Sequence, residues 1–216
     1  MRRMVKRLTP AAALCAAFAL CLCAGWPVMA DEPPSAPALS LTVIGVKNEI
    51  KDPQWENQLI GTGISNLVLQ ALYETGRYRP IEDNPEILAE VDRMVALQWA
   101  GESPPVEEAD AERLAGELKT DAVAWARTIR FSTSRRRGGI GGVFSGAKTT
   151  VTVDVEVFVK EKGRPQISAR GRGRSTTNST GVFFQIRKDQ VYFDQTTVGK
   201  ATQEAVYTAV KEMKIK

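Results

Sequence analysis

The strict alternation of residues 149–160 restricts the fold more than any other feature of the sequence. Every second residue from Val151 to Val159 is a valine, and polar side chains occupy Thr152, Asp154 and Glu156 between them. A period of two predicts a strand with one buried face and one polar face. Residues 161–164 (Glu-Lys-Gly-Arg) are typical of a hairpin turn. We therefore expect an antiparallel hairpin at the centre of the domain.

The second strand of this hairpin, predicted over residues 165–176, separates small from basic side chains. One face holds Ile167, Ala169, Gly171 and Gly173, and the other holds Ser168, Arg170, Arg172 and Arg174. The arginines fall opposite or diagonal to Asp154 and Glu156. We expect cross-strand ion pairs, each contributing about 0.2–1 kcal/mol.

Helical and strand patterns alternate through the rest of the chain. Strands are predicted over 39–47, 78–82 and 122–131, and helices over 55–75, from Pro85 to the break at 101–105, over 106–119 and over 198–213. Residues 135–147 are predicted to be a Gly- and Arg-rich loop, and 175–197 form a polar and aromatic stretch. The order β-α-β-α-α-β-β-β-α predicts an α/β (α+β layered) domain, with a mixed sheet of about five strands and three or four helices.

The N-terminus carries an export pattern. Four basic residues precede an apolar run over 11–22, and Val28-Met29-Ala30 provides small residues at a signal-peptidase site. The apolar run is shorter than the roughly 20 residues of a membrane-spanning helix. Each cysteine follows a leucine, which does not fit a lipoprotein signal. We expect a signal peptide over 1–30, a Pro-rich leader over 31–38, a single domain over 39–216, and a periplasmic location.

Composition argues against catalysis. All three cysteines lie in the predicted signal peptide and the chain has no histidine, so nucleophilic triads and common transition-metal sites lack their usual residues. Residues 141–149 resemble a phosphate-binding loop, but Ala147 separates the second glycine from Lys148, and the segment precedes a strand. We expect no enzymatic activity and no catalytic, cofactor-binding or metal-binding residues.

Charge is divided between the two halves of the chain. Residues 31–121 hold 18 acidic and 7 basic side chains, a net charge of −11, whereas residues 122–216 hold 7 and 18, a net charge of +11. This division indicates either two solvated faces or head-to-tail contact between subunits of a homo-oligomer.

The basic run at 135–137 fits anionic lipid headgroups or an acidic envelope protein better than nucleic acid; an idle loop is the alternative. The candidate partner-contact residues are Arg135, Arg136, Arg137, Phe144, Phe183 and Phe184.

An ordered series of segments resembles the family of the curli transport component CsgG over about residues 40–215. The segments are Leu41–Val46, Ile60–Ser65, Ala71–Tyr78, Ile81–Leu88, Ala111–Gly116 and Thr120–Val123, followed by the valine hairpin. The resemblance implies an envelope protein that assembles into rings; the best-known member is an outer-membrane lipoprotein through which unfolded amyloid subunits leave the cell.

Three departures separate this chain from a pore. It has no lipoprotein signal, the link over 48–55 is short, and three consecutive arginines would place at least one against lipid, at a cost of about 2–4 kcal/mol at mid-membrane. The leading hypothesis is a soluble periplasmic CsgG-like protein that assists secretion or assembly of extracellular, curli-like material through protein contacts. The alternative is a periplasmic adaptor that activates a penicillin-binding protein or another cell-wall synthase.

The export prediction has a direct test. Intact-mass spectrometry of the native protein from the envelope fraction should give a chain that begins at Asp31 and carries no acyl group, because signal peptidase cuts after Ala30. A diacylglycerol-modified cysteine at the N-terminus would contradict this expectation.

Overall fold

The computed structural model describes residues 37–81, 85–138, 146–178 and 183–215. The predicted signal peptide, most of the leader, the cap positions 83–84 and Phe144 lie outside these residues. Everything below concerns the domain from Pro37 onward.

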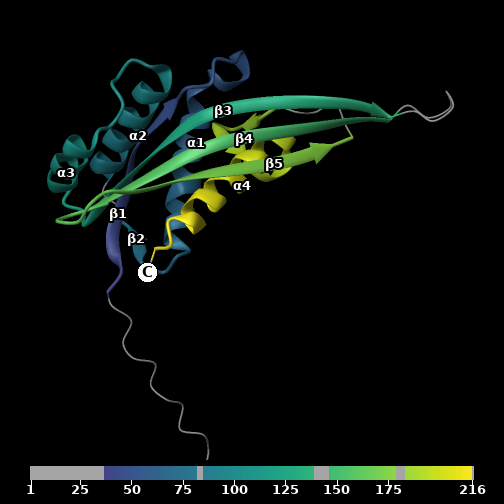
Figure 1. The fold of residues 1–216 in the computed structure, drawn as a ribbon. Coiled ribbons are helices and arrows are strands. Elements are labelled where there is room, and N and C mark those ends of the chain that lie inside the picture. The colour runs from purple at the N-terminus through teal and green to yellow at the C-terminus, as the bar shows by residue number, and fades with distance from the viewer. Residues whose placement is uncertain (1–36, 82–84, 139–145, 179–182, 216) are drawn as a thin grey trace, which may run out of the picture. The chain divides into compact units, whose positions relative to one another are not determined.

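The domain is built on a mixed sheet of five strands. In spatial order these are β2 (Tyr78–Pro80), β1 (Leu39–Asn48), β3 (Ala122–Gly138), β4 (Gly146–Glu161) and β5 (Ile167–Thr177). β1 is parallel to both of its neighbours, and β3, β4 and β5 form an antiparallel meander (Figure 1). The predicted mixed sheet and element order are confirmed.

In the part of the chain that the structure describes, four helices accompany the sheet: α1 (Gln58–Tyr73), α2 (Pro85–Ala100), α3 (Glu108–Glu117) and α4 (Thr197–Glu212). The side chain of Asn57 accepts a hydrogen bond from the backbone N–H of Leu59, and Thr196 accepts one from Gly199, so both α1 and α4 begin at a side-chain cap. The first helix starts later than predicted because a 3₁₀ turn, Pro53–Trp55, precedes it.

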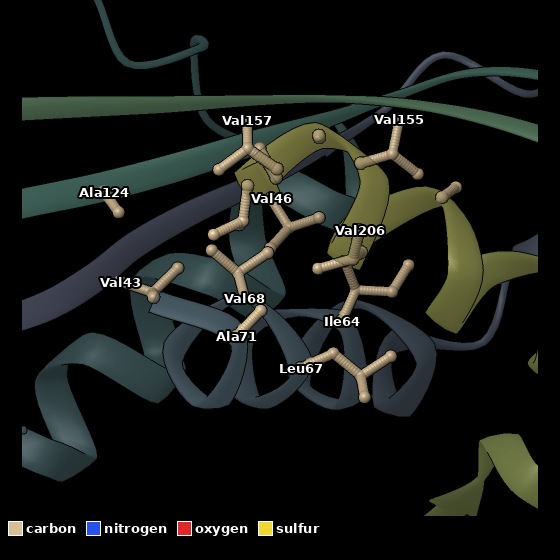
Figure 2. Packing of buried hydrophobic residues seen from close by; sticks show 14 of the residues in the cluster. Val43, Val46, Ile64, Leu67, Val68, Ala71, Ala124, Val155, Val157 and Val206 are labelled. Atoms are coloured by element: carbon tan, nitrogen blue, oxygen red, sulfur yellow. The ribbon is translucent and has the colours of Figure 1, made fainter. Parts of the chain in front are cut away.

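The valine row of β4 lies at the centre of the core. All five valines, from Val151 to Val159, are at most 1% exposed. They pack against Ile64 and Val68 of α1 and Val206 of α4, as Figure 2 shows for Val155 and Val157. The buried face predicted from the alternation is confirmed.

The backbone of α4 lies directly on β5. A Cβ atom added to Gly171 would collide with the backbone of Ala205 and Ala209, and one added to Gly173 would collide with Ala201 and Ala205. Glycines on the strand and alanines on the helix are therefore required for this close approach.

A smaller apolar cluster lies on the other side of the sheet, under α3. Its buried members are Ile44, Val106, Ala111, Ala115, Val123, Trp125 and Phe158. The rings of Trp125 and Phe158 stack with centroids 5.3 Å apart, and the Arg127 guanidinium lies 4.8 Å from the centroid of the Phe158 ring. This cluster covers the sheet only near the start of β3.

A β-bulge between Thr128 and Arg130 changes which residues of β3 face the core. Before the bulge the even-numbered residues Ala124, Ala126 and Thr128 pair with the buried valines of β4, whereas after it the odd-numbered Phe131 pairs with Val153. The two halves of β3 therefore alternate in opposite phase.

Two segments differ from the sequence prediction. The expected loop over 135–147 is wrong at both ends: β3 continues to Gly138 and β4 begins at Gly146, whereas 139–145 lie outside the described residues. Ladder pairing between the two strands overrides the weak strand preference of Gly- and Arg-rich sequence. In the 175–197 stretch, β6 (Gln185–Arg187) and β7 (Gln190–Tyr192) form a small hairpin, whose turn residues Lys188 and Asp189 have φ angles of 48° and 59°.

The contact between α4 and β5 can be tested with two glycine substitutions. Gly171→Ala should lower the free energy of unfolding by about 2–3 kcal/mol, because its methyl group has no space against the helix backbone. Gly116→Ala is the matched control: its Cβ meets nothing within 4 Å, and alanine in a helix should stabilise by about 0.5–1 kcal/mol. Urea denaturation gives both values; equal effects would contradict the close contact.

Candidate functional site

The side of β3, β4 and β5 that faces away from α1 and α4 is rich in arginine. Besides Lys160, which is buried and paired with Glu108 of α3, strand register places seven cationic side chains on it: Arg127, Arg130, Arg136, Lys148, Arg170, Arg172 and Arg174. Two carboxylates, Asp154 and Glu156, lie among them. We call this surface the cationic face. Its charged side chains come from three strands, and those of β3 come from both sides of the bulge.

Asp154 organises the centre of the cationic face. It is 1% exposed, and its carboxylate accepts hydrogen bonds from Arg172 Nε at 2.7 Å, Arg172 Nη2 at 3.1 Å and Arg170 Nη2 at 3.0 Å. The arginine side chains remain 51% and 64% exposed, so they cover the carboxylate while facing solvent. The hydrogen bonds from Arg172, followed by its charge and those of Arg170, lower the pKa of Asp154 against the opposing effect of burial. The predicted ion pairs are confirmed for Asp154.

Like charges meet further along the hairpin. Arg136 of β3 is directly opposite Lys148 of β4 in the ladder, and both side chains are exposed. Like charges directly opposite one another destabilise a sheet. This pair therefore gives the isolated domain no stability, and it extends the positive field of the cationic face away from Asp154.

Strand alternation separates the three consecutive arginines of the predicted site. Arg136 lies on the cationic face, whereas Arg135 pairs with Thr149 and so lies on the opposite face of the hairpin. Arg137 pairs with Ala147. The predicted cluster is thus an extended strand segment with arginines on both sides.

The predicted phenylalanines do not form one surface. Phe144 lies outside the described residues, and Phe183 is 56% exposed. Phe184 packs edge-on against Trp55, with ring centroids 4.9 Å apart, and also contacts Phe193 at 5.9 Å. Of this set, Phe183 presents an exposed ring, while Phe184 contributes to packing.

Sequence reasoning missed the contribution of β3 and the start of β4 to the cationic face. The alternation of residues 167–174 correctly predicted the position of the three arginines of β5. Arg127 and Arg130 are three residues apart, so simple alternation assigns them to opposite faces; the bulge brings them to the same one. Nothing in the local sequence marks Ile129 as the extra residue.

A second charged cluster lies on the core side, where β4 ends. Glu161 accepts hydrogen bonds from Arg77 Nε at 2.7 Å, Arg77 Nη2 at 2.8 Å and the Tyr78 hydroxyl at 2.7 Å, and Arg164 lies 3.1 Å away. Arg77 lowers the pKa of Glu161, and burial together with Glu161 raises the pKa of Tyr78. A cavity of about 280 Å³ lies beside this cluster. The hydrogen bonds of Glu161 with Arg77 and Tyr78 connect the start of β2 to the end of β4.

Among the described residues, no group of three or more acidic side chains is arranged to hold a metal ion. No helix in this part of the chain is both long enough and apolar enough to span a bilayer.

Comparison with known proteins identifies the family. The model described as "Curli production assembly/transport component CsgG" matches residues 31–216. The chain belongs to the CsgG family. A comparison of this CsgG-family chain with curated proteins found no match.

Two solved structures resemble the CsgG-family chain at low identity. The lipoprotein GNA1162 from Neisseria meningitidis is 17% identical, with a TM-score of 0.41; the match covers 67% of this chain and 87% of that one. The hypothetical protein CT253 from Chlamydia trachomatis is 14% identical, with a TM-score of 0.28, and the match covers 62% and 73% of the two chains.

Removing the Asp154 carboxylate should destabilise the domain in a pH-dependent way. Asp154→Asn should lower the free energy of unfolding at neutral pH by about 1–3 kcal/mol, since hydrogen bonds to a charged acceptor are lost. Because the folded protein lowers the pKa of Asp154, this stability is present above the unfolded pKa of about 3.9 and is lost as pH falls through the native pKa.

Denaturant titrations from pH 7 to pH 3 measure this effect. The difference between wild type and Asp154→Asn should shrink on acidification. Glu156→Gln, on the same strand and face but partly exposed, is the matched control and should change stability by no more than about 0.5 kcal/mol. A pH-independent difference for Asp154→Asn would contradict the role given to the carboxylate.

Proposed function

We propose that this CsgG-family chain is an exported, periplasmic protein that assists the secretion or assembly of extracellular material by binding polypeptides through the cationic face. It acts by contact and has no enzymatic activity of its own. The observation that carries the proposal is the arginine array held around Asp154, in which guanidinium groups are fixed in place yet remain more than half exposed.

A fixed cationic surface suits recognition of an acidic partner. Guanidinium groups already oriented by Asp154 lose little conformational freedom on binding, and their combined field accelerates encounter with a partner of opposite charge. The unfavourable pairing of Arg136 with Lys148 would be relieved by carboxylates from such a partner. These arguments favour a binding surface over a solvated face without a role.

Family membership and the predicted signal peptide support a place in the cell envelope. The charge division supports self-association as well, since the acidic half includes exposed carboxylates on α2 and α3, among them Glu90, Asp92 and Glu112. Contact between the acidic helices of one subunit and the cationic face of the next would be head-to-tail, the type of contact that closes into rings.

Site-specific photo-crosslinking in growing cells tests this function. A benzoylphenylalanine at Ser132, exposed on the cationic face, should crosslink to subunits of an extracellular fibre, to outer-membrane factors, or to a second copy of the chain. The same probe at Ala89, exposed on α2, is the positional control for capture of surface polypeptides. Arg170→Gln with Arg174→Gln should abolish the Ser132 products while leaving the Arg172–Asp154 pair in place.

The identity of the crosslinked protein decides between the two functional hypotheses. Fibre subunits or outer-membrane secretion factors support the proposed role. Recovery of a peptidoglycan synthase from Ser132 would replace it with the adaptor alternative. Products that are equally abundant with the arginine variant would show that the cationic face is not the binding surface.

A further inference from the structure

β5 is one of the two outer strands of the five-stranded sheet within the described residues. It pairs with β4 on one side over Ile167–Thr177, and no described strand pairs with its other side. The outer edge of such a strand presents a row of backbone N–H and C=O groups. We refer to this row as the β5 edge.

The groups that point outward can be assigned from one hydrogen bond. The backbone N–H of Arg174 donates to Glu204 Oε2 of α4 at 2.8 Å, so it points away from β4. Outward and inward groups alternate along an antiparallel strand, and hence Ser168, Arg170, Arg172 and Thr176 also direct their backbone groups outward. The N–H of Gln166, two residues before Ser168, donates to Glu108 at 3.4 Å, in agreement with this alternation.

Backbone donors and guanidinium groups occur at the same residues of the β5 edge. By register, the side chains of Ser168, Arg170, Arg172 and Arg174 all lie on the cationic face. A strand added to this edge would place its directly opposite side chains beside three arginines. Opposite charges in such cross-strand positions stabilise pairing, so carboxylates are the complementary side chains.

Glu204 already shows one element of this recognition within the chain. Its carboxylate accepts from an outward backbone N–H of β5, next to the arginine row. A charged side chain at a sheet edge also limits indiscriminate strand pairing. Glu204 therefore occupies one position of the edge, and an incoming strand would have to displace it or end beside it.

We infer that the β5 edge binds an extended segment of a partner polypeptide as a sixth strand, with carboxylate side chains at alternate positions facing Arg170, Arg172 and Arg174. The inference rests on the proposed function in taking a polypeptide as the partner, and it adds the conformation and charge pattern of the bound segment. An anionic membrane surface would use the arginines but not the row of backbone donors, which is why a strand is the better fit.

The test uses fluorescein-labelled ten-residue peptides of alternating Thr and Asp and the mature protein, with binding followed by fluorescence anisotropy. In one matched peptide every Asp is N-methylated, and in the other every Thr is. Each modification blocks one backbone edge of the peptide without changing its charge. One of these peptides should bind at least about tenfold more weakly than the unmodified peptide, and the other within about threefold of it. A Thr-Lys peptide should not bind.

Three protein variants examine the same site. Ser168→Pro removes one outward N–H without altering charge or the ladder to β4, and should weaken binding. Arg170→Gln with Arg174→Gln should weaken it further, whereas Glu204→Ala should strengthen it by removing the internal competitor. Circular dichroism checks folding, and the methylated peptides carry the test if Ser168→Pro does not fold.

Three results would overturn the inference. Equal affinity of the two methylated peptides would show that binding depends on charge and not on backbone hydrogen bonds at the β5 edge. Sedimentation showing a dimer of the free protein that Ser168→Pro dissociates would make a second copy the occupant. Binding to phosphatidylglycerol vesicles that is tighter than to the peptide and unaffected by Ser168→Pro would identify a membrane surface. If the peptides fail but crosslinking at Ser132 persists, the proposed function stands and only the strand-binding mode is lost.

Discussion

The direct contact between α4 and β5 is the interaction on which the rest of the domain depends. Gly171 and Gly173 allow the helix backbone to rest on the strand, and α4 then seals the valines of β4 from water. Ala169, Gly171 and Gly173 alternate with the arginines of β5, so placing these small residues against α4 puts all the arginines on the other side. A single packing requirement thus produces both the dry core and the cationic face.

Asp154 gives that face its order. A buried carboxylate contributes stability only if its hydrogen bonds offset its desolvation, and two arginines supply three hydrogen bonds here. Both guanidinium groups stay largely in water, which keeps their own desolvation small. The same contacts that hold the strands together therefore hold the arginines in fixed positions, so stability and the proposed recognition depend on one residue.

Sequence alone was sufficient wherever a regular period continued through an element. It predicted the valine row, the four helices, the strand order along the chain and the arginine side of β5. It was insufficient where pairing between distant residues decided the outcome. The extension of β3 through Arg135 and Arg136 comes from its ladder with β4, and the turn at Lys188–Asp189 adopts positive φ angles without the glycine that usually marks them. The sequence therefore predicted only part of the candidate site. It located the arginines of β5, whereas the face on which the arginines of β3 lie depends on the bulge.

The bulge at Thr128–Arg130 also decides how a small change in sequence would act on the far half of the hairpin. Side chains there alternate with a phase set by one extra residue, Ile129. Loss of the codon for Ile129 would remove the bulge but leave Arg130 opposite Asp154, so both faces of residues 130–138 would be kept. A substitution that let Ile129 itself pair with Asp154 would shift the segment by one position and exchange its two faces. Arg136 would then leave the cationic face and Arg135 would enter it. A lineage could therefore redistribute charge between two surfaces by losing the bulge while keeping every side chain beyond it.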